Sequence, residues 1–390
     1  MKMLLKWLFR LVATLVVVGI VLGIWHREKL TRLLAVNSLF SEEKIVSNFS
    51  AMGGMFETVA MPRGDGPISP LPAGPAFDLP TNVQDWIVAR NITGLVILQN
   101  GQLRHESYYL QDPDSAQTAQ RISWSVAKSY LSILVGTLLE DGTIESIDDL
   151  VTRYAPQLAG SAYEGATMRN VLNMSSGVMF NEDSVDFWSD INQMGRILAL
   201  GGSMDGFTAD LTETFADAGE TWKYVSIDTH VVGMVVRGAS GRSVPDLLNE
   251  RVLQPLGLEG SPYYVADGYG VAFVLGGLNV STRDYARFGA MVAQGGEWNG
   301  NRIVTEAWIA DSFTPSAPTA AGEIGYGYQW WIPQGSDEGV AMGRGFYGQY
   351  IYIDRMRGVV IAVNAADRAF RDDGVGDQNI ALFRQIAEGL

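Results

Sequence analysis

Strand-like segments lie near both ends of the folded part of this chain, and this distribution constrains the fold more than any other feature of the sequence. Residues 95–109 hold two strand-like runs on either side of Asn100-Gly101, the residue pair that a tight two-residue hairpin turn requires. Residues 350–363 repeat the pattern around a second turn. We therefore predict one antiparallel sheet built from the two ends of the folded region.

Helices are expected between the strand-like segments. The first begins at Ser125 and ends at Asp141-Gly142, and apolar residues cover most of its faces, which is typical of a buried helix. Residues 147–265 are predicted to form mainly further helices, and residues 377–389 a terminal one. The pattern predicts an α/β (α+β) fold, in which helices flank the antiparallel sheet and an all-helical lobe is inserted. The active site would then lie between the sheet and the lobe.

Residues 4–25 form an apolar N-terminal segment that only Lys6 and Arg10 interrupt. A charged start is also typical of a cleaved signal peptide, but no small-x-small cleavage site follows, so we predict an uncleaved transmembrane helix. Positive residues are almost equally frequent on its two sides, which leaves the orientation of the anchor open. A buried helix of a soluble protein is the alternative.

This N-terminal segment defines the predicted domain organisation. Residues 1–3 form a short tail, 4–25 the transmembrane anchor, 26–80 a stem or an extended wrap over the domain, and 81–390 the folded domain. With this organisation, we expect the protein to be held in the inner membrane by its N-terminal helix. The folded domain would then lie on the extracytoplasmic side.

Composition removes several classes of chemistry. The chain has no cysteine, which excludes a thiol nucleophile, a thiolate metal site and a disulfide. Its acidic residues are scattered without metal-ligand spacing, and pairs such as Glu182-Asp183 are interpreted as surface or capping groups, so we expect neither a metal nor a cofactor. A net charge of −15 argues against nucleic-acid binding, because it repels phosphate.

A serine and a lysine one helical turn apart, Ser125 and Lys128, offer covalent chemistry without histidine. The start of a helix favours developing negative charge on the serine oxygen, while burial and the same helix dipole disfavour the ammonium form of the lysine. The tetrad alone is weak evidence, because Ser41 and Lys44 have the same spacing. That copy is flanked by acids and is interpreted as a helix cap, so its context selects Ser125.

Other catalytic patterns lack the structural context that they need. His105 lies in a predicted strand and His230 in a predicted helix, where a structural role is more common than membership of a catalytic triad. Residues 343–348 match the Gly-x-Gly-x-x-Gly fingerprint of dinucleotide binding, but a strand follows instead of a helix. The remaining route to covalent chemistry is an activated hydroxyl.

Three motifs, in order along the chain, carry a resemblance to a known family. Residues 123–129 surround the tetrad, residues 167–177 contain Thr-x-Arg followed by a leucine-containing turn and Ser-Gly, and residues 218–226 contain a Tyr-x-Ser element. With these motifs, residues 94–390 resemble the serine β-lactamase and penicillin-binding-protein superfamily, in its class C-like branch. Within that branch the resemblance is to the 6-aminohexanoate-dimer hydrolase type, and it implies a class C β-lactamase-like fold.

The resemblance also implies roles for individual residues. Ser125 would be the nucleophile, and Lys128 and Tyr224 would move protons. The backbone N–H groups of Ser125 and Phe346 would form the oxyanion hole. The residues implied to bind substrate or to support the site are Ser226, Arg344, Gly345, Phe187 and Trp188. The last two lie on a loop that often closes over the substrate in this family, and core packing is their alternative role.

One departure from the family pattern narrows the substrate. The Lys-Thr-Gly tripeptide that lactamases and transpeptidases carry on the strand lining the site is absent, and Arg344 would replace its charge. The sequence therefore predicts hydrolysis of a small-molecule or peptide-like ester or amide through an acyl-enzyme. The alternatives are a cell-wall D-amino-acid peptidase or carboxypeptidase, a β-lactamase, and a non-catalytic membrane-tethered scaffold that retains the fold.

Overall fold

The computed structural model describes residues 2–25 and 27–390 and is built around a seven-stranded antiparallel sheet. Its strand order is β3-β2-β13-β12-β11-β10-β9. The early strand β2 (Ile92–Gln99) pairs with the late strand β13 (Val359–Ala365), which confirms the predicted sheet from both ends of the folded part. The other strands are β3 (Gln102–Tyr108), β9 (Gly325–Gly327), β10 (Trp330–Ile332), β11 (Val340–Gly345) and β12 (Gln349–Asp354).

The first hairpin turns where the sequence predicts. Asn100 has a φ of 50° and Gly101 a φ of 75°, so both residues adopt the left-handed backbone that this type of turn requires. Gln99 and Gln102 face each other as the last pair before the turn. The turn is therefore determined by two adjacent residues, and it fixes the register of β2 against β3.

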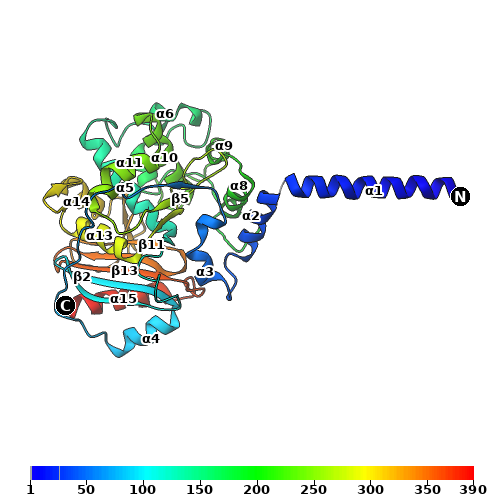
Figure 1. Ribbon diagram of the computed structural model, residues 1–390. Helices are drawn as coiled ribbons and strands as arrows, with labels where there is room; N and C mark the ends of the chain where they lie inside the picture. The colour runs from blue at the N-terminus through cyan, green and yellow to red at the C-terminus, as the bar shows by residue number, and fades with distance from the viewer. Residues whose placement is uncertain (1, 26) are drawn as a thin grey trace.

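Helices cover both faces of the large sheet (Figure 1). The helices α4 (Thr81–Ala89) and α15 (Val375–Glu388) pack on one face. The helices α5 (Ala127–Glu140) and α13 (Thr282–Ala293) pack on the other. Successive side chains of β2 point alternately into these two cores, as strand geometry dictates. The sheet is thus buried between two helical layers.

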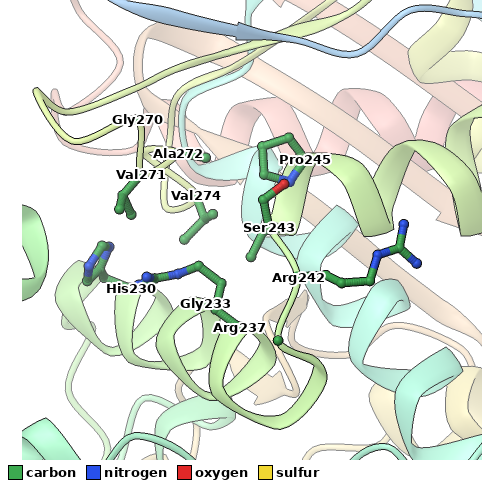
Figure 2. A pocket seen from close by; sticks show the side chains of 12 residues that line it. His230, Gly233, Arg237, Arg242, Ser243, Pro245, Gly270, Val271, Ala272 and Val274 are labelled. Atoms are coloured by element: carbon green, nitrogen blue, oxygen red, sulfur yellow. The ribbon is translucent and has the colours of Figure 1, made fainter.

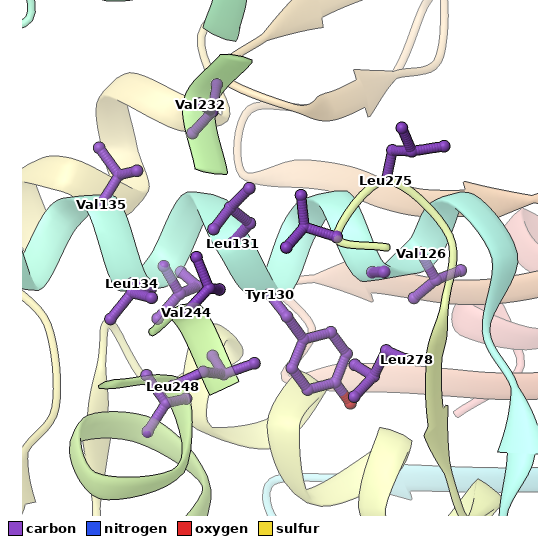
Figure 3. Packing of buried hydrophobic residues seen from close by; sticks show 14 of the residues in the cluster. Val126, Tyr130, Leu131, Leu134, Val135, Val232, Val244, Leu248, Leu275 and Leu278 are labelled. Atoms are coloured by element: carbon purple, nitrogen blue, oxygen red, sulfur yellow. The ribbon is translucent and has the colours of Figure 1, made fainter. Parts of the chain in front are cut away.

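The helix α5 runs through the interior, as its apolar pattern predicts. Every residue from Ala127 to Leu138 is buried. Tyr130 stacks on Phe288 of α13, with ring centroids 3.7 Å apart. On its lobe side, α5 lies against α10 (Ser226–Ser240) and α11 (Val244–Leu248), and Figure 3 shows their valines and leucines meeting. The N-terminal end of α5 therefore lies between the sheet and the lobe.

The inserted region is mainly helical, but it contributes to a small second sheet that the sequence analysis did not predict. This sheet has the order β1-β5-β6-β4, so the inserted region is not all helical. Its strands are too short to show an alternating pattern in the sequence: β1 (Thr58–Ala60), β4 (Arg121–Ile122), β5 (Tyr263–Val265) and β6 (Leu278–Val280). Further α-helices and strands of the body are α6 (Val151–Tyr154), α7 (Met168–Leu172), α8 (Asp190–Leu200), α9 (Met204–Ala209), α12 (Gln254–Leu256), α14 (Glu306–Ser312), β7 (Glu297–Trp298) and β8 (Asn301–Arg302).

The N-terminal part of the chain begins with α1 (Lys2–Trp25) and α2 (Arg27–Ser38), and α1 extends away from the body of the molecule (Figure 1). The chain after α2 lies along that body. Its short helix α3 (Ile45–Phe49) buries both of its end residues, and β1 pairs with β5 at the edge of the small sheet. The segment after α2 is therefore packed against the fold.

No helix among residues 2–25 and 27–390 is long and apolar enough to cross a membrane. This finding contradicts the predicted transmembrane helix, the membrane as a partner, and the inner-membrane localisation with an extracytoplasmic domain. Lys6 and Arg10 interrupt the apolar segment. They limit the uncharged run to residues 11–25, which is shorter than the roughly 20 residues that a helix needs to span a bilayer.

Gly136 permits the contact between α5 and α14, and its replacement tests this packing. A Cβ atom at Gly136 would lie 2.4 Å from Trp308 Cδ1, so the helices must separate to accept it. We expect Gly136→Ala to lower the free energy of unfolding by about 1–3 kcal/mol, measured by urea denaturation. Gly195→Ala on α8 is the matched control, because a Cβ there meets nothing within 4 Å. Equal effects of the two substitutions would contradict the packing account.

Candidate active site

Ser125 lies in a tight turn that leads directly into α5. The turn is a 3-10 helix over Trp124–Val126, so the α-helix begins slightly later than predicted. Trp124 has a φ of 46°, a conformation that side-chain-bearing residues adopt only at a cost in free energy. The Ser123 N–H donates to the Leu278 carbonyl of β6 at 2.7 Å, which ties the turn to the small sheet.

Lys128 is buried one turn after Ser125. Its Nζ atom lies 3.0 Å from Ser125 Oγ and donates to the Leu275 carbonyl at 2.5 Å. Its side chain is 1% exposed, and burial lowers the pKa of Lys128 to about 7, while the negative charge of Glu182 acts in the opposite direction. Near neutral pH, a large fraction of this amine is therefore uncharged and faces the serine hydroxyl.

Tyr224 lies beside the same pair. The Lys128 Nζ atom is 5.5 Å from the centroid of its ring, and the ring stacks on Trp331 of β10 with centroids 5.3 Å apart. Burial and the negative charge of Glu182 raise the pKa of Tyr224. Hydrogen bonds to Ser125 and Ser226 offset only part of this rise. The phenol therefore carries its proton at neutral pH.

Glu182 reaches the site through the N-terminus of α10. Its carboxylate accepts hydrogen bonds from the Ser226 backbone N–H at 2.5 Å and from Ser226 Oγ at 3.1 Å. Burial raises the pKa of Glu182, and the Ser226 hydrogen bonds and the charge of Lys128 lower it. The sequence analysis interpreted Glu182 as a surface or capping group and missed its proximity to Lys128. An acidic residue in a loop gives no signal of that contact.

The strand β11 approaches the turn over Trp124–Val126 from the sheet side. We call this turn the nucleophile turn, after the predicted role of Ser125. A Cβ atom at Gly345 would lie 2.6 Å from the Ser123 carbonyl oxygen and 3.2 Å from the Ser125 nitrogen. Only glycine therefore allows the end of β11 to come this close. Phe346 follows immediately, so the structure brings the two predicted oxyanion-hole residues, Ser125 and Phe346, to the same place.

Arg344, also on β11, is an uncompensated charge beside these groups. Its guanidinium carbon lies 5.5 Å from the centroid of the Trp331 ring, and its positive charge lowers the pKa of Tyr224 slightly against the effect of burial. Within residues 2–25 and 27–390, Arg344 forms no ion pair and no side-chain hydrogen bond. Arg344 is therefore a cation without a counter-ion among the described residues, and it lies next to Trp331.

Phe187 and Trp188 lie on the loop after Glu182, but their rings face solvent. They are 58% and 79% exposed, which excludes the alternative of core packing. The rings contact each other with centroids 4.9 Å apart, and the Arg196 guanidinium covers Phe187 at 4.6 Å. The structure therefore places this pair on an exposed loop beside the site and not against Ser125.

The two histidines considered for a triad have partners elsewhere. His230 Nε2 lies 2.8 Å from Asp205 Oδ1, and its ring lines a separate cavity of about 310 Å³ together with Arg237 (Figure 2). His105 contacts a serine of its own strand, β3. These contacts agree with a structural role for both histidines, and the amine next to Ser125 is that of Lys128.

Comparison with known proteins identifies the family. The sequence profile of the family described as Beta-lactamase matches residues 87–385. The chain belongs to the beta-lactamase family. It is 29% identical over 336 residues to a 6-aminohexanoate-dimer hydrolase of Paenarthrobacter ureafaciens, covering 81% of this chain and 84% of that protein. This beta-lactamase-family protein is a serine hydrolase that is similar to a 6-aminohexanoate-dimer hydrolase, which confirms the resemblance in the sequence.

Solved structures show the same fold for this beta-lactamase-family hydrolase. A putative 6-aminohexanoate-dimer hydrolase from Bacillus anthracis aligns with a TM-score of 0.79 at 21% identity, covering 90% of this chain and 95% of that one. A family VIII carboxylesterase aligns with a TM-score of 0.59 at 14% identity, covering 80% of this chain and 99% of that one. The predicted β-lactamase-like combination of antiparallel sheet and helices is thereby confirmed.

Lys128→Met tests the electrostatic state of the buried amine through stability. An unfolded lysine titrates near pH ~10.4, whereas burial lowers the pKa of Lys128 to about 7. Between these values the unfolded chain binds more protons, so the contribution of Lys128 to the free energy of unfolding rises with pH. We expect wild type to gain up to about 1.4 kcal/mol per pH unit over the variant between about pH 7.5 and about pH 9.5 in urea denaturation. Parallel pH profiles would contradict this.

Proposed function

We propose that this hydrolase cleaves an ester or amide bond through an acyl-enzyme on Ser125. The observation that carries the proposal is the 3.0 Å contact between Ser125 Oγ and the buried Lys128 amine, whose environment favours the uncharged form. Lys128 accepts the hydroxyl proton as Ser125 Oγ attacks the substrate carbonyl. Tyr224 donates its proton to the leaving group and recovers one from Lys128, and a water molecule then attacks the acyl-enzyme with the same groups accepting its proton.

The developing oxyanion is stabilised by the backbone N–H groups of Ser125 and Phe346. The close approach of Gly345 to the nucleophile turn supports this pairing. The N-terminus of α5 adds a favourable dipole at the same place. Ser226 orients the site by holding the Glu182 carboxylate next to Lys128. The proposed catalytic domain, residues 81–390, contains the whole family match.

The preferred substrate is a small linear amide or ester that carries a carboxylate. Arg344 supports this choice, because an unpaired guanidinium beside Tyr224 offers a fork-shaped partner for a carboxylate on the leaving group. The Paenarthrobacter relative is named for the 6-aminohexanoate dimer, an amide with a terminal carboxylate, which makes that dimer the first substrate to test. Phe187 and Trp188 offer apolar surface for the rest of the chain.

The alternatives receive less support from the site. A β-lactamase or a D-amino-acid peptidase of this superfamily uses Lys-Thr-Gly on the strand that lines the site, and this chain has Gly343-Arg344-Gly345 there. A non-catalytic scaffold does not account for a lysine amine that is buried against a serine hydroxyl at a cost in hydration. Stable acylation of the purified protein by a penicillin would favour the peptidase over the hydrolase proposed here.

Labelling with a fluorophosphonate tests the nucleophile. The reagent forms an O–P bond with an activated serine and releases fluoride, so we expect wild type to be labelled and Ser125→Ala not to be. Ser41→Ala is the matched control, because Ser41 and Lys44 repeat the same spacing outside the site, and this variant should still be labelled. Equal labelling of wild type and Ser125→Ala, measured by intact mass, would exclude Ser125 as the nucleophile.

Arg344→Gln tests the substrate class. A hydrogen bond to a charged group contributes about 1.5–3 kcal/mol, so its loss should lower kcat/KM for a carboxylate-bearing amide by at least about 10-fold. Turnover of a neutral p-nitrophenyl ester should change much less, because that substrate has no carboxylate for the guanidinium. Arg242→Gln removes an exposed arginine elsewhere and should alter neither rate. Equal losses with both substrates would show that Arg344 supports the fold or the catalytic groups.

A further inference from the structure

Four aromatic rings from three distant segments meet next to the nucleophile turn. The rings belong to Phe40, Phe49, Trp124 and Tyr347, and we call them the aromatic clamp. Phe40 stacks on Tyr347, with centroids 4.9 Å apart and an interplanar angle of 16°. Phe49 meets Trp124 at 5.6 Å and Tyr347 at 5.4 Å, both edge to face. Two rings of the clamp therefore come from residues 39–49, which we call the α3 segment, and two from the site itself.

The two rings from the site belong to residues with unusual backbone geometry. Trp124 directly precedes Ser125 and has a φ of 46°. Tyr347 directly follows Phe346 and has a φ of 57°. Left-handed backbone at a bulky aromatic residue costs free energy, and it persists only where the surrounding packing imposes it. The clamp supplies such packing on both sides, immediately next to the two proposed oxyanion donors.

The α3 segment is itself fixed to the fold, as a rigid support must be. Leu39, Ile45 and Phe49 are each less than 5% exposed. Glu42 forms an exposed ion pair of 2.9 Å with Arg368, and the Asn48 side chain braces the segment internally by donating to two carbonyls at the end of α2. Movement of Phe49 away from the site would therefore disrupt buried contacts, whereas Phe40 is partly exposed.

We propose that Phe40 and Phe49 are positioning residues that hold the Ser125 and Phe346 backbone N–H groups at the spacing the oxyanion requires. Ser125 lies in the 3-10 turn before α5 and Phe346 directly follows β11, so no shared helix or strand sets their separation. Their segments touch at Gly345, and the clamp covers that junction from outside. Phe40 and Phe49, which lie before the family match at residues 87–385, would thus support the working site through their rings. This inference rests on the proposed acyl-enzyme function.

Steady-state kinetics of Phe40→Ala, Phe49→Ala and the double variant test the inference. A small displacement of an oxyanion donor weakens binding of the transition state more than that of the substrate. With a p-nitrophenyl ester below the unfolding transition, we expect kcat to fall about 10- to 100-fold in the double variant, with KM changed less than about 3-fold. Phe49→Leu keeps an apolar side chain of similar volume and should recover most of the lost rate.

A second measurement separates positioning from general loss of stability. Phenylboronic acid bonds reversibly to an activated serine and places an oxygen where the oxyanion forms, so its affinity should fall by about the same factor as kcat/KM. Phe383→Ala is the matched control for Phe49→Ala, because it also removes a buried ring, one that meets Trp86 and Tyr350 on the opposite side of the sheet. This control should lose stability and keep both kcat and boronic-acid affinity.

The outcomes distinguish the inference from the function on which it rests. If the Phe40 and Phe49 variants keep the kcat and boronic-acid affinity of Phe383→Ala while Ser125→Ala is inactive, the aromatic clamp does not position the donors and the inference is wrong. If Ser125→Ala turns over the ester at the wild-type rate, the acyl-enzyme itself is wrong, and the role of the donors is lost with it. A selective loss of kcat with recovery in Phe49→Leu supports the clamp.

Discussion

Burial of the Lys128 amine is the constraint on which the rest of the site depends. An ammonium ion in a protein interior loses its hydration, so a buried lysine is stable only when it is uncharged or when protein dipoles replace the water. Here the Leu275 carbonyl and the Ser125 hydroxyl are the two partners of Nζ, and the Glu182 carboxylate favours the charged form. Burial and the carboxylate act against each other and bring the pKa of Lys128 to about 7, where an amine can both accept and return a proton.

That balance requires segments far apart in the sequence to meet at one point. The helix α5 supplies Lys128, a loop supplies the Leu275 carbonyl, and Glu182 is held by the first residue of α10, Ser226. Both helices begin at the site, so the positive ends of their dipoles face it. The sheet contributes from the other side through β11, where Gly345 permits contact. The geometry of the site therefore depends equally on the packing of the lobe and of the sheet.

Features set within a few residues could be predicted from the sequence, and contacts between distant segments could not. Asn100-Gly101 determines its own turn, and the spacing of Ser125 and Lys128 places both on one helical turn. Glu182 looks like any surface acid until the fold brings it to Ser226, and nothing local marks the meeting of Phe49 with Trp124. The wrong prediction of a membrane anchor rested on one local feature, the apolar segment of residues 4–25, whose uninterrupted part covers only residues 11–25.

Trp331 connects substrate binding with proton transfer in the proposed site. Its ring stacks on Tyr224 and also lies under the Arg344 guanidinium. A planar guanidinium gains from such stacking in a way that a lysine ammonium on a flexible stem does not, and the stacking also limits the orientations of its donor fork. In the proposed site, Gly343-Arg344-Gly345 in the place of Lys-Thr-Gly would therefore do more than preserve a charge. It would orient the charge on the same aromatic surface that contacts the tyrosine, so a bound carboxylate would be placed relative to the proposed proton donor of the leaving group.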